Sequence, residues 1–332
     1  MAQYELHDFG KRINLNTDLK NISEEICKNY NLGTYISNEV IATGYEDYNY
    51  VLDTTKGKYC VKIFNKNRTQ KDLNDYLDRI RIVAKTETNA PKPLFIDGDI
   101  LLSLNYGQNH YDICVFEFIN GKNFFEMNKT PSKEAIIELA KQAAFINTLD
   151  IQPDFVYDSW AVINFEKEYS KKREYLSDEF KKEFDRLLKE FKEIDFYKLP
   201  KAFVHGDMIT TNVMLDNDSK VWILDFSVSN YMPRIIELAV ISCNICLDKE
   251  SKEKTYENIE LLLREYNKYN KLSNYELEVF GVFNKLAHAM HILQTQYIIQ
   301  TDCNSEENQY WLNEGTTGFL FYDNERFSKL LK

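Results

Sequence analysis

The chain has 332 residues, of which 44% are hydrophobic and 28% are charged, and its formal net charge at pH 7 is −11. This composition is that of a folded protein, and the length allows one large domain or two lobes with separate cores. The negative charge argues against a non-specific nucleic-acid-binding protein, which needs a basic face to neutralise phosphates.

The N-terminus and the cysteines indicate a cytoplasmic protein. Residues 1–16 lack the apolar core of a secretory signal, and no apolar run reaches the length that spans a bilayer. Six cysteines in a chain of this size are too sparse for a disulfide framework. We therefore expect neither a membrane nor a nucleic-acid partner, and the oligomeric state cannot be read from these features.

The first part of the chain predicts a sheet with two helices. Polar capping residues and apolar positions at helical spacing indicate helices, and short runs rich in β-branched and aromatic residues between turn signals indicate strands. In chain order the prediction is a helix over 16–33, strands over 38–44, 48–55 and 58–64, a helix over 68–85, and strands over 99–107 and 111–118.

From about residue 131 onward the pattern is mostly helical. The candidate helices span 132–148, 164–196, 235–247, 252–269 and 275–301. A sheet-rich first part and a helix-rich second part indicate two lobes. We expect an N-terminal lobe over 1–116, a hinge over 117–123 ("EFINGKN"), and a C-terminal lobe over 124–332.

The stretch "VHGDMITTNVMLDNDSKVWILDFSVS", residues 204–229, interrupts the helical pattern. It predicts a polar loop followed by a hairpin, with strands at "NVML" and "VWIL" and "DNDS" as the turn. Asp207 and Asn212 precede the first strand and Asp225 follows the second, so the hairpin would bring the three side chains together. Two carboxylates and an amide suit a hard cation such as Mg²⁺, although Asp and Asn also favour turns and caps without any ligand.

Several motifs occur together in the order found in kinases. His205, Asp207 and Asn212 have the spacing His-x-Asp-x-x-x-x-Asn of a kinase catalytic loop, and an Asp-Phe pair begins at Asp225 where protein kinases have Asp-Phe-Gly. Upstream, "YCVKIF" contains Lys62 on a third strand, as the Val-Ala-Ile-Lys lysine does. We expect His205 to support the loop rather than to carry protons.

The chain resembles the aminoglycoside phosphotransferase and choline kinase family. Three further segments occur in the order found in that family: "ATGYEDYNYVL", "VFEFINGKNF" and "MPRIIELAV". The resemblance runs from the first helix to residue 247, with a slight lean toward the homoserine-kinase-like branch. It implies an α+β, bilobal protein-kinase-like fold, with an antiparallel sheet and helix in the N-lobe and a mainly helical C-lobe. It also implies transfer of the γ-phosphate of ATP or GTP to a hydroxyl of an aminoglycoside, a choline-like amino alcohol, homoserine or a sugar.

The same resemblance assigns roles to residues of this chain. Asp207 is the expected catalytic base that accepts or orients the proton of the acceptor hydroxyl. Asn212 and Asp225 are the expected Mg²⁺ ligands. Backbone groups near Glu117 and Ile119 are expected to bind the adenine edge. Phosphoryl transfer depends on positioning and charge neutralisation, which these residue types supply.

The phosphate-binding side of the site departs from the protein kinase pattern. Lys62 is expected to pair with the inner phosphates, and Gly44 is the single glycine of the loop that would cover them; Gly44 is equally well explained as a hairpin glycine. The helix after Lys62 lacks the expected Glu, because the inward position is Tyr76. Asp72, one turn earlier, is the fallback partner of Lys62.

Two other functional classes stay open. A pseudokinase would keep the fold and bind nucleotide as a regulatory protein, but the full set of motif residues argues against it. A protein kinase is disfavoured by His-Gly-Asp in place of His-Arg-Asp and by the absence of an Ala-Pro-Glu segment after Asp225.

Residues outside these motifs have simpler interpretations. Cys243 and Cys246 form a CxxC without a second pair, in an apolar helix, so we expect core packing rather than zinc or redox chemistry. His288 and His291 lie three apart on a helix without an evident third ligand, and we expect them to be helix or pocket residues. The tail 308–322, rich in aromatic residues, either lines an acceptor pocket with its residues at 310, 311 and 314 or caps the core.

Overall fold

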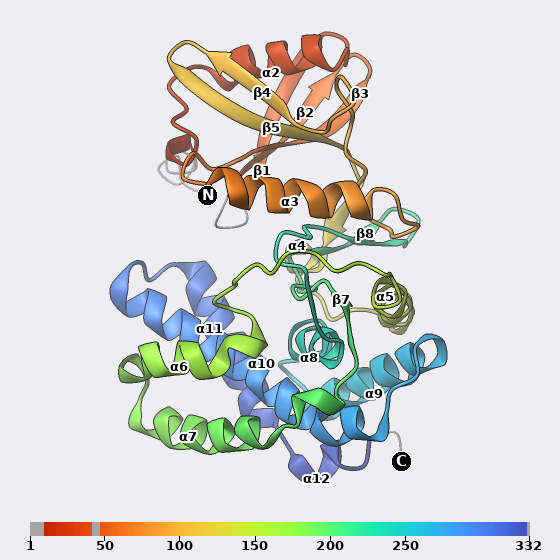
Figure 1. Ribbon diagram of the computed structural model, residues 1–332, viewed down its shortest axis with the longest axis vertical. Coiled ribbons are helices and arrows are strands. Elements are labelled where there is room, and N and C mark those ends of the chain that lie inside the picture. The colour runs from red at the N-terminus through yellow and green to blue at the C-terminus, as the bar shows by residue number, and fades with distance from the viewer. Residues whose placement is uncertain (1–9, 42–46, 331–332) are drawn as a thin grey trace. The chain divides into compact units, whose positions relative to one another are not determined.

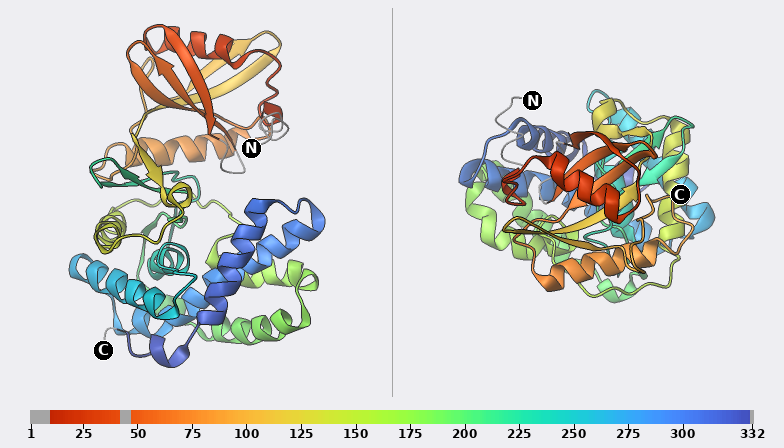
Figure 2. Two further views of the ribbon diagram at one scale, coloured as in Figure 1. Left: turned by 180° about the vertical axis from the view of Figure 1, so that it is seen from behind. Right: turned by 90° about the horizontal axis from the view of Figure 1, so that it is seen from above.

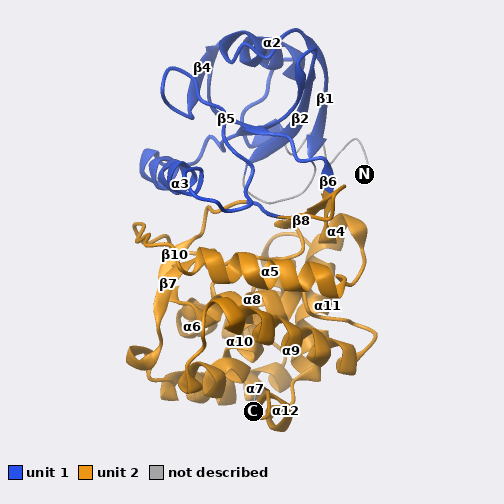
Figure 3. Cartoon of the chain, turned by 90° about the vertical axis from the view of Figure 1, so that its right-hand side faces the viewer, with its two compact units in different colours: residues 1–121, 222–224 blue, residues 122–221, 225–332 orange. Residues whose placement is uncertain are grey.

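The computed structural model describes residues 10–41 and 47–330. The chain divides into two compact units, residues 1–121 with 222–224 and residues 122–221 with 225–332 (Figure 3). The boundary between the units falls within the segment 117–123, whose role as a hinge stays a prediction.

The first unit is built on a five-stranded sheet in which every neighbouring pair is antiparallel. The strand order is β1-β2-β3-β5-β4, so sequence neighbours pair except where β5 lies between β3 and β4. The strands are β1 (Tyr35–Ile41), β2 (Tyr48–Thr54), β3 (Gly57–Ile63), β4 (Leu102–Tyr106) and β5 (Asn109–Glu117). All five match strands that the sequence predicts.

Two helices cover the two faces of this sheet (Figure 1, Figure 2). Helix α2 (Leu19–Asn29) packs on the face that buries Tyr50, Val61 and Ile113. Helix α3 (Gln70–Val83) packs on the opposite face, against Cys114. Successive strand residues point to opposite faces, which is why neighbours in β5 belong to different cores.

The second unit is mainly helical, as predicted. Its helices are α4 (Phe124–Met127), α5 (Lys133–Ile146), α6 (Phe165–Lys172), α7 (Asp178–Glu193), α8 (Ile235–Asn244), α9 (Lys252–Tyr269), α10 (Asn274–Thr301), α11 (Glu306–Phe321) and α12 (Asn324–Phe327), with 3-10 turns at Val162–Asn164, Arg173–Tyr175 and Phe196–Lys198. Strands β7 (Lys201–Val204) and β10 (Asn230–Pro233) form an antiparallel pair. Within the described residues, no helix combines the length and apolarity needed to cross a bilayer.

The predicted hairpin is present in the stretch that interrupts the helices. Strands β8 (Val213–Asp216) and β9 (Val221–Ile223) are neighbours in a small sheet of order β6-β8-β9, where β6 is Gly121–Asn123. The turn between β8 and β9 is closed by Asp216, whose Oδ1 accepts hydrogen bonds from the backbone N–H groups of Asp218 and Lys220, both at 2.9 Å. An Asp side chain at the start of a turn commonly makes such bonds.

The sequence prediction fails at three places in the helices. The single helix expected over 164–196 is two helices, because Ser177 caps the start of α7 by accepting from the N–H of Phe180. Helix α11 was not predicted as a helix. The first helix is capped by Asp18 rather than by a residue at 16 or 17, since the Asp18 carboxylate accepts from the N–H of Lys20 at 2.9 Å.

Helices α10 and α11 pack closely through glycines. A Cβ built on Gly315 would lie 2.7 Å from the Cβ of His291 and 2.9 Å from the carbonyl oxygen of His288. A Cβ on Gly318 would lie 1.9 Å from the ring of His288. The backbone of α10 cannot move away without disturbing its own hydrogen bonds, so the glycines are needed for the close approach.

We expect Gly315→Ala to destabilise the protein by about 1–3 kcal/mol, because the methyl group overpacks the contact between α10 and α11. In an ordinary helix the same change would stabilise it by about 1 kcal/mol. The exposed Asn313→Ala in the same helix is the matched control and should not destabilise. Urea unfolding measures both, and a Gly315→Ala variant as stable as Asn313→Ala would contradict the packing argument.

Candidate active site

The loop after β7 brings together three of the motif residues. The Nδ2 of Asn212 donates to the Oδ2 of Asp207 at 2.7 Å and to its backbone carbonyl at 3.1 Å. The backbone N–H of Asp207 donates to the Nδ1 of His205 at 3.1 Å. An Nδ1 that accepts carries no proton, so this contact places the imidazole proton on Nε2. His205 is fully buried with its ring edge-to-face on Phe226 at 4.5 Å, which fits a supporting residue.

A buried carboxylate from α8 holds the start of this loop. Glu237 is fully buried, and its two oxygens accept the backbone N–H groups of His205 at 2.6 Å and Gly206 at 3.1 Å. Burial raises the pKa of Glu237 to about 7, and the hydrogen bonds from His205 and Gly206 oppose that rise. Two hydrogen bonds from successive backbone N–H groups to one buried side chain fix the backbone at the start of the loop.

A buried amide and a buried tyrosine hydroxyl extend this support. The Nδ2 of Asn147, at the end of α5, donates to the carbonyl of Phe203 at 2.9 Å and lies 3.5 Å from Glu237, and the hydroxyl of Tyr266 on α9 donates to the Oδ1 of Asn147 at 2.8 Å. Three helices therefore contribute to the bonds that position the start of the loop.

The far end of the loop is tied to the same helix. The N–H of Thr210 donates to the Oδ1 of Asn244 at 2.6 Å, and its carbonyl accepts from the N–H of Phe125 at 3.0 Å. Glu237 and Asn244 are seven residues apart, so they lie two turns apart on one face of α8. One helix face thus holds both ends of the loop that carries Asp207.

Two backbone positions in this region have left-handed conformations. Gly206 has φ +82°, and a Cβ there would also lie 3.1 Å from the Cε of Met232. Asp225 has φ +58°, which is uncommon for a residue other than glycine, and its Oδ1 accepts from the N–H of Ser227 at 3.1 Å. An Asp tolerates this conformation through such a local bond. Left-handed residues other than glycine, such as Asp225, cluster at functional sites.

The donor set is suited to a magnesium ion. The N–H₂ group of Asn212 donates to Asp207, so the amide oxygen of Asn212 points away from Asp207. Asp225 supplies a carboxylate after β9, whereas Asn212 directly precedes β8, so the antiparallel hairpin has both residues at the same end. Amide and carboxylate oxygens are the ligands that Mg²⁺ prefers. The roles of Asn212 and Asp225 as metal ligands stay a prediction.

Lys62 of the first unit has a partner that the sequence prediction missed. Its Nζ lies 3.5 Å from the Oδ2 of Asp47, whose side chain is 2% exposed. The expectation that Asp72 pairs with Lys62 is wrong, because Asp72 is exposed and accepts a 2.6 Å hydrogen bond from the hydroxyl of Thr69 at the start of α3. Tyr76 is buried at the inward helix position, as expected.

The other residues predicted to contact the nucleotide are Gly44, Glu117 and Ile119. Gly44 lies outside the described residues. Glu117 ends β5 and exchanges bonds with Lys92: its Oε1 accepts from the N–H of Lys92 at 2.8 Å, and its own N–H donates to the Lys92 carbonyl at 3.0 Å. The carbonyl of Ile119 accepts from the N–H of Gly121 at 3.0 Å. Adenine binding by Glu117 and Ile119 stays a prediction.

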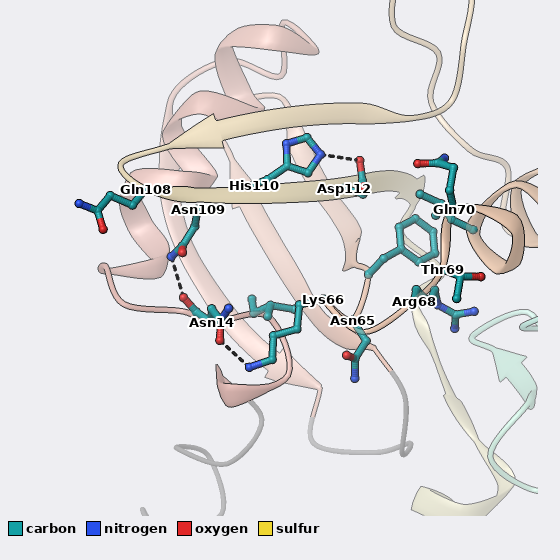
Figure 4. Close-up of a pocket in the computed structure, with 13 residues that line it drawn as sticks. Asn14, Asn65, Lys66, Arg68, Thr69, Gln70, Gln108, Asn109, His110 and Asp112 are labelled. Atoms are coloured by element: carbon teal, nitrogen blue, oxygen red, sulfur yellow. Dashed lines mark hydrogen bonds and ion pairs between the residues drawn. The ribbon is translucent and has the colours of Figure 1, made fainter.

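A pocket of about 320 Å³ in the first unit lies apart from these residues. It is lined by the segments 13–14, 64–66, 68–70 and 108–110 with the residues at 73 and 112, and none of the predicted site residues lines it (Figure 4). Some of its polar groups bond to one another: Asn14 accepts from Lys66 and Asn109, and His110 pairs with Asp112. We assign no ligand to it.

The cysteine pair and His288 are buried and His291 is partly buried, which fits their interpretation as packing residues of the helices. Cys243 and Cys246 are buried free thiols, and burial raises both pKa values. Burial lowers the pKa of His288 to about 3 and that of His291 to about 4, so both rings are neutral at pH 7. Among the described residues, no group of three His, Cys, Asp or Glu side chains is arranged to hold a metal ion.

The aromatic tail forms helix α11. Trp311 is 5% exposed, and the ring of Tyr310 contacts that of Phe125 edge-to-face at 4.9 Å. Glu314 is buried and pairs with the Nζ of Lys249 at 2.5 Å, although burial raises its pKa. These contacts fit a helix that covers the core.

Sequence reasoning missed Glu237 and Asn244, although a signal was present. Both are polar residues inside the apolar run "IIELAVISCNICL", seven positions apart. A polar side chain buried in a helix must find partners, and here both find backbone N–H groups of the loop that carries Asp207.

The structure and the sequence are similar to known phosphotransferases. Residues 37–266 match the model described as the phosphotransferase enzyme family. Over 275 residues the chain is 22% identical to a homoserine kinase of Bartonella henselae, covering 81% of this chain and 83% of that one. The amicoumacin kinase hAmiN, solved with AMP-PNP, Ca²⁺ and Ami, superposes with a TM-score of 0.65 at 16% identity, covering 99% of this chain and 98% of that one.

A spectinomycin phosphotransferase, APH(9)-Ia, solved with ADP and spectinomycin, superposes with a TM-score of 0.66 at 15% identity, covering 92% of this chain and 98% of that one. With the N-terminal antiparallel sheet and the helical second part, these superpositions confirm the predicted kinase-like fold.

Glu237 should make the free energy of unfolding decrease as the pH rises toward 7. Because its pKa is raised from 4.5 to about 7, the folded chain binds a proton between these values that the unfolded chain does not. Its contribution to the free energy of unfolding should therefore fall as the pH rises from about 4.5 to about 7. His288 and His291 oppose this trend, since their lowered pKa values favour the folded state as the pH rises.

Comparison with Glu237→Gln isolates the effect of Glu237. The stability advantage of the wild type over this variant, measured by urea unfolding, should shrink as the pH rises from about 4.5 to about 7. An advantage that grows with pH would mean that the two backbone hydrogen bonds outweigh burial and keep the carboxylate ionised.

Proposed function

Because the chain belongs to the phosphotransferase enzyme family, whose model matches residues 37–266, we propose that it transfers the γ-phosphate of ATP to a hydroxyl of a small amino-bearing molecule. Family membership makes the protein a small-molecule kinase that acts on a hydroxyl group. The finer proposal is that the acceptor is homoserine or a close relative, and that Mg²⁺ accompanies the nucleotide.

The choice of acceptor class has two supports. The relative from Bartonella henselae is named a homoserine kinase, and the chain covers 83% of its length. The net charge of −11 suits an acceptor with an ammonium group, which would be attracted to an acidic protein. ATP is proposed as the donor because the amicoumacin kinase structure holds the ATP analogue AMP-PNP.

The contact between Asn212 and Asp207 carries the proposed chemistry. The 2.7 Å hydrogen bond fixes the orientation of the Asp207 carboxylate within a loop that is itself held at both ends. In this proposal the Asp207 carboxylate accepts the proton that the acceptor hydroxyl loses. The hydroxyl oxygen then bonds to the γ-phosphorus while the bond from that phosphorus to the β–γ bridging oxygen breaks, and ADP leaves.

Other residues bind or position the reactants in this proposal. Asn212 and Asp225 would hold Mg²⁺, which when bound neutralises charge on the phosphate oxygens. Lys62 would pair with the inner phosphates, and backbone groups near Glu117 and Ile119 would contact the adenine. Phosphoryl transfer needs little more than this positioning and charge neutralisation.

The first experiment is acceptor-dependent release of ADP from Mg-ATP by the purified protein. The panel contains homoserine, choline, aminoglycosides and common sugars, and we expect homoserine or another amino-bearing acceptor to give the rate. Asp225→Ala is the blank. A rate with a neutral sugar alone would contradict the proposed acceptor class, and no binding of ATP or GTP by the wild type would contradict the proposed function.

Asp207→Ala should lower kcat by about 10²- to 10⁴-fold with the preferred acceptor, because the variant loses the group that takes the hydroxyl proton. Its affinity for ATP, measured by calorimetry, should be nearly unchanged. The matched control is Asp218→Ala in the exposed hairpin turn, which should keep wild-type activity. If Asp207→Ala retained most of its turnover, the assigned base would be wrong.

A further inference from the structure

Asp47 in the first unit is a buried carboxylate shared by two cations. Its Oδ2 lies 3.5 Å from the Nζ of Lys62 and 3.0 Å from the Nη2 of Arg68, and its Oδ1 accepts from the Nε of Arg68 at 3.2 Å. The side chains are 2% exposed for Asp47, 12% for Lys62 and 16% for Arg68. A carboxylate so deeply buried needs charge partners, and here it has two.

The backbone also orients Asp47. The N–H of Asn65, just after β3, donates to its Oδ1 at 3.0 Å, and the Nη1 of Arg12 donates to its backbone carbonyl at 3.2 Å. Arg68 is bound by its Nε and Nη2 atoms to the two different oxygens, which is the two-point geometry that fixes a carboxylate in one plane. Asp47 is therefore a rigid acceptor for the Lys62 ammonium.

Helix α3 contributes an aromatic face where a glutamate was expected. The Nζ of Lys62 lies 5.0 Å from the ring centroid of Tyr76, and the guanidinium carbon of Arg68 lies 5.4 Å from the same centroid. Both distances are within the range of cation–π attraction. The helix thus supplies the ring, and the segment before β2 supplies the negative charge.

The pairing of β2 with β3 explains why Asp47 reaches Lys62. Thr54 pairs with Gly57 at the turn, and Asn49 pairs with Lys62 farther along. Asp47 lies two residues before Asn49, so the alternation of a strand directs it to the face of the sheet that carries Lys62. Diagonal cross-strand neighbours of this kind are within reach of long side chains.

We propose that Asp47 is the positioning residue of Lys62, replacing the helix glutamate that is absent from α3. This inference rests on the proposed function, because it assumes that Lys62 binds nucleotide phosphates. The three groups carry one net positive charge, so the cluster can still attract an anionic phosphate. Its carboxylate anchor directly precedes β2, so the position of Lys62 depends on the pairing of β2 with β3 rather than on the placement of a helix.

The test is a double-mutant cycle between Asp47 and Lys62, read by the affinity for Mg-ATP in calorimetry, which needs no acceptor. We expect Asp47→Asn and Lys62→Met each to weaken binding on the order of 10-fold. The first variant displaces the charge that faces the phosphates, and the second removes it. The double variant should bind no more weakly than Lys62→Met alone, since Asp47 acts through Lys62.

Three controls accompany the cycle. Asp72→Asn removes an exposed carboxylate of α3 and should bind like the wild type. Thermal unfolding checks that each variant is folded. If Asp47→Asn does not fold, Asp47→Glu takes its place in the cycle, because it keeps a charge between Lys62 and Arg68 while shifting its position.

The outcomes separate this inference from the proposed function. Wild-type affinity in Asp47→Asn, or single effects that multiply in the double variant, would overturn the role of Asp47 and leave the kinase proposal standing. A wild-type protein that binds no nucleoside triphosphate would overturn both. Weakened binding in Asp47→Asn that disappears in the Lys62→Met background would support the proposal.

Discussion

The arrangement of the loop that carries Asp207 depends on the buried side chain of Glu237. Two successive backbone N–H groups, those of His205 and Gly206, donate to its two oxygens, and so the loop turns at a point fixed by helix α8. The left-handed φ of Gly206 makes this turn possible. Asn244, two helical turns along, then fixes the other end. Asp207 is held within a segment whose backbone polar groups are largely satisfied, which restricts the positions that its carboxylate can adopt.

The first unit uses a buried carboxylate in a different way. Asp47 accepts from two cationic side chains, whereas Glu237 accepts mainly from backbone N–H groups. A carboxylate between two cations leaves the cluster with a net positive charge, which suits the phosphate-binding role proposed for Lys62. A carboxylate bound by backbone amides fixes chain geometry instead. In both cases burial makes the contact specific, because an unpaired charge in the interior would be costly.

Local patterns predicted most of the elements, and the failures have local causes. The five strands of the first sheet and helices α3, α5, α9 and α10 follow from periodicity and capping. The predicted helix over 164–196 continued through Ser177 because its charged residues keep a helical pattern on both sides of the cap. Helix α11 was missed because its glycines and aromatic residues give a weak helical signal, and its glycines are required by contact with α10 rather than by its own conformation.

By itself the sequence determined the fold class, through the order of its motifs. It also predicted that Asp207 and Asn212 lie close together, because their spacing acts over a few residues of one loop. Only the tertiary structure decided what supports that loop and what pairs with Lys62. The Glu237 contact joins residues 32 apart in the chain, and the salt bridge of Asp47 with Lys62 depends on a strand register. Capping and periodicity involve residues close together in the sequence. The partners of a buried polar or charged side chain come from segments that only the tertiary structure brings into contact.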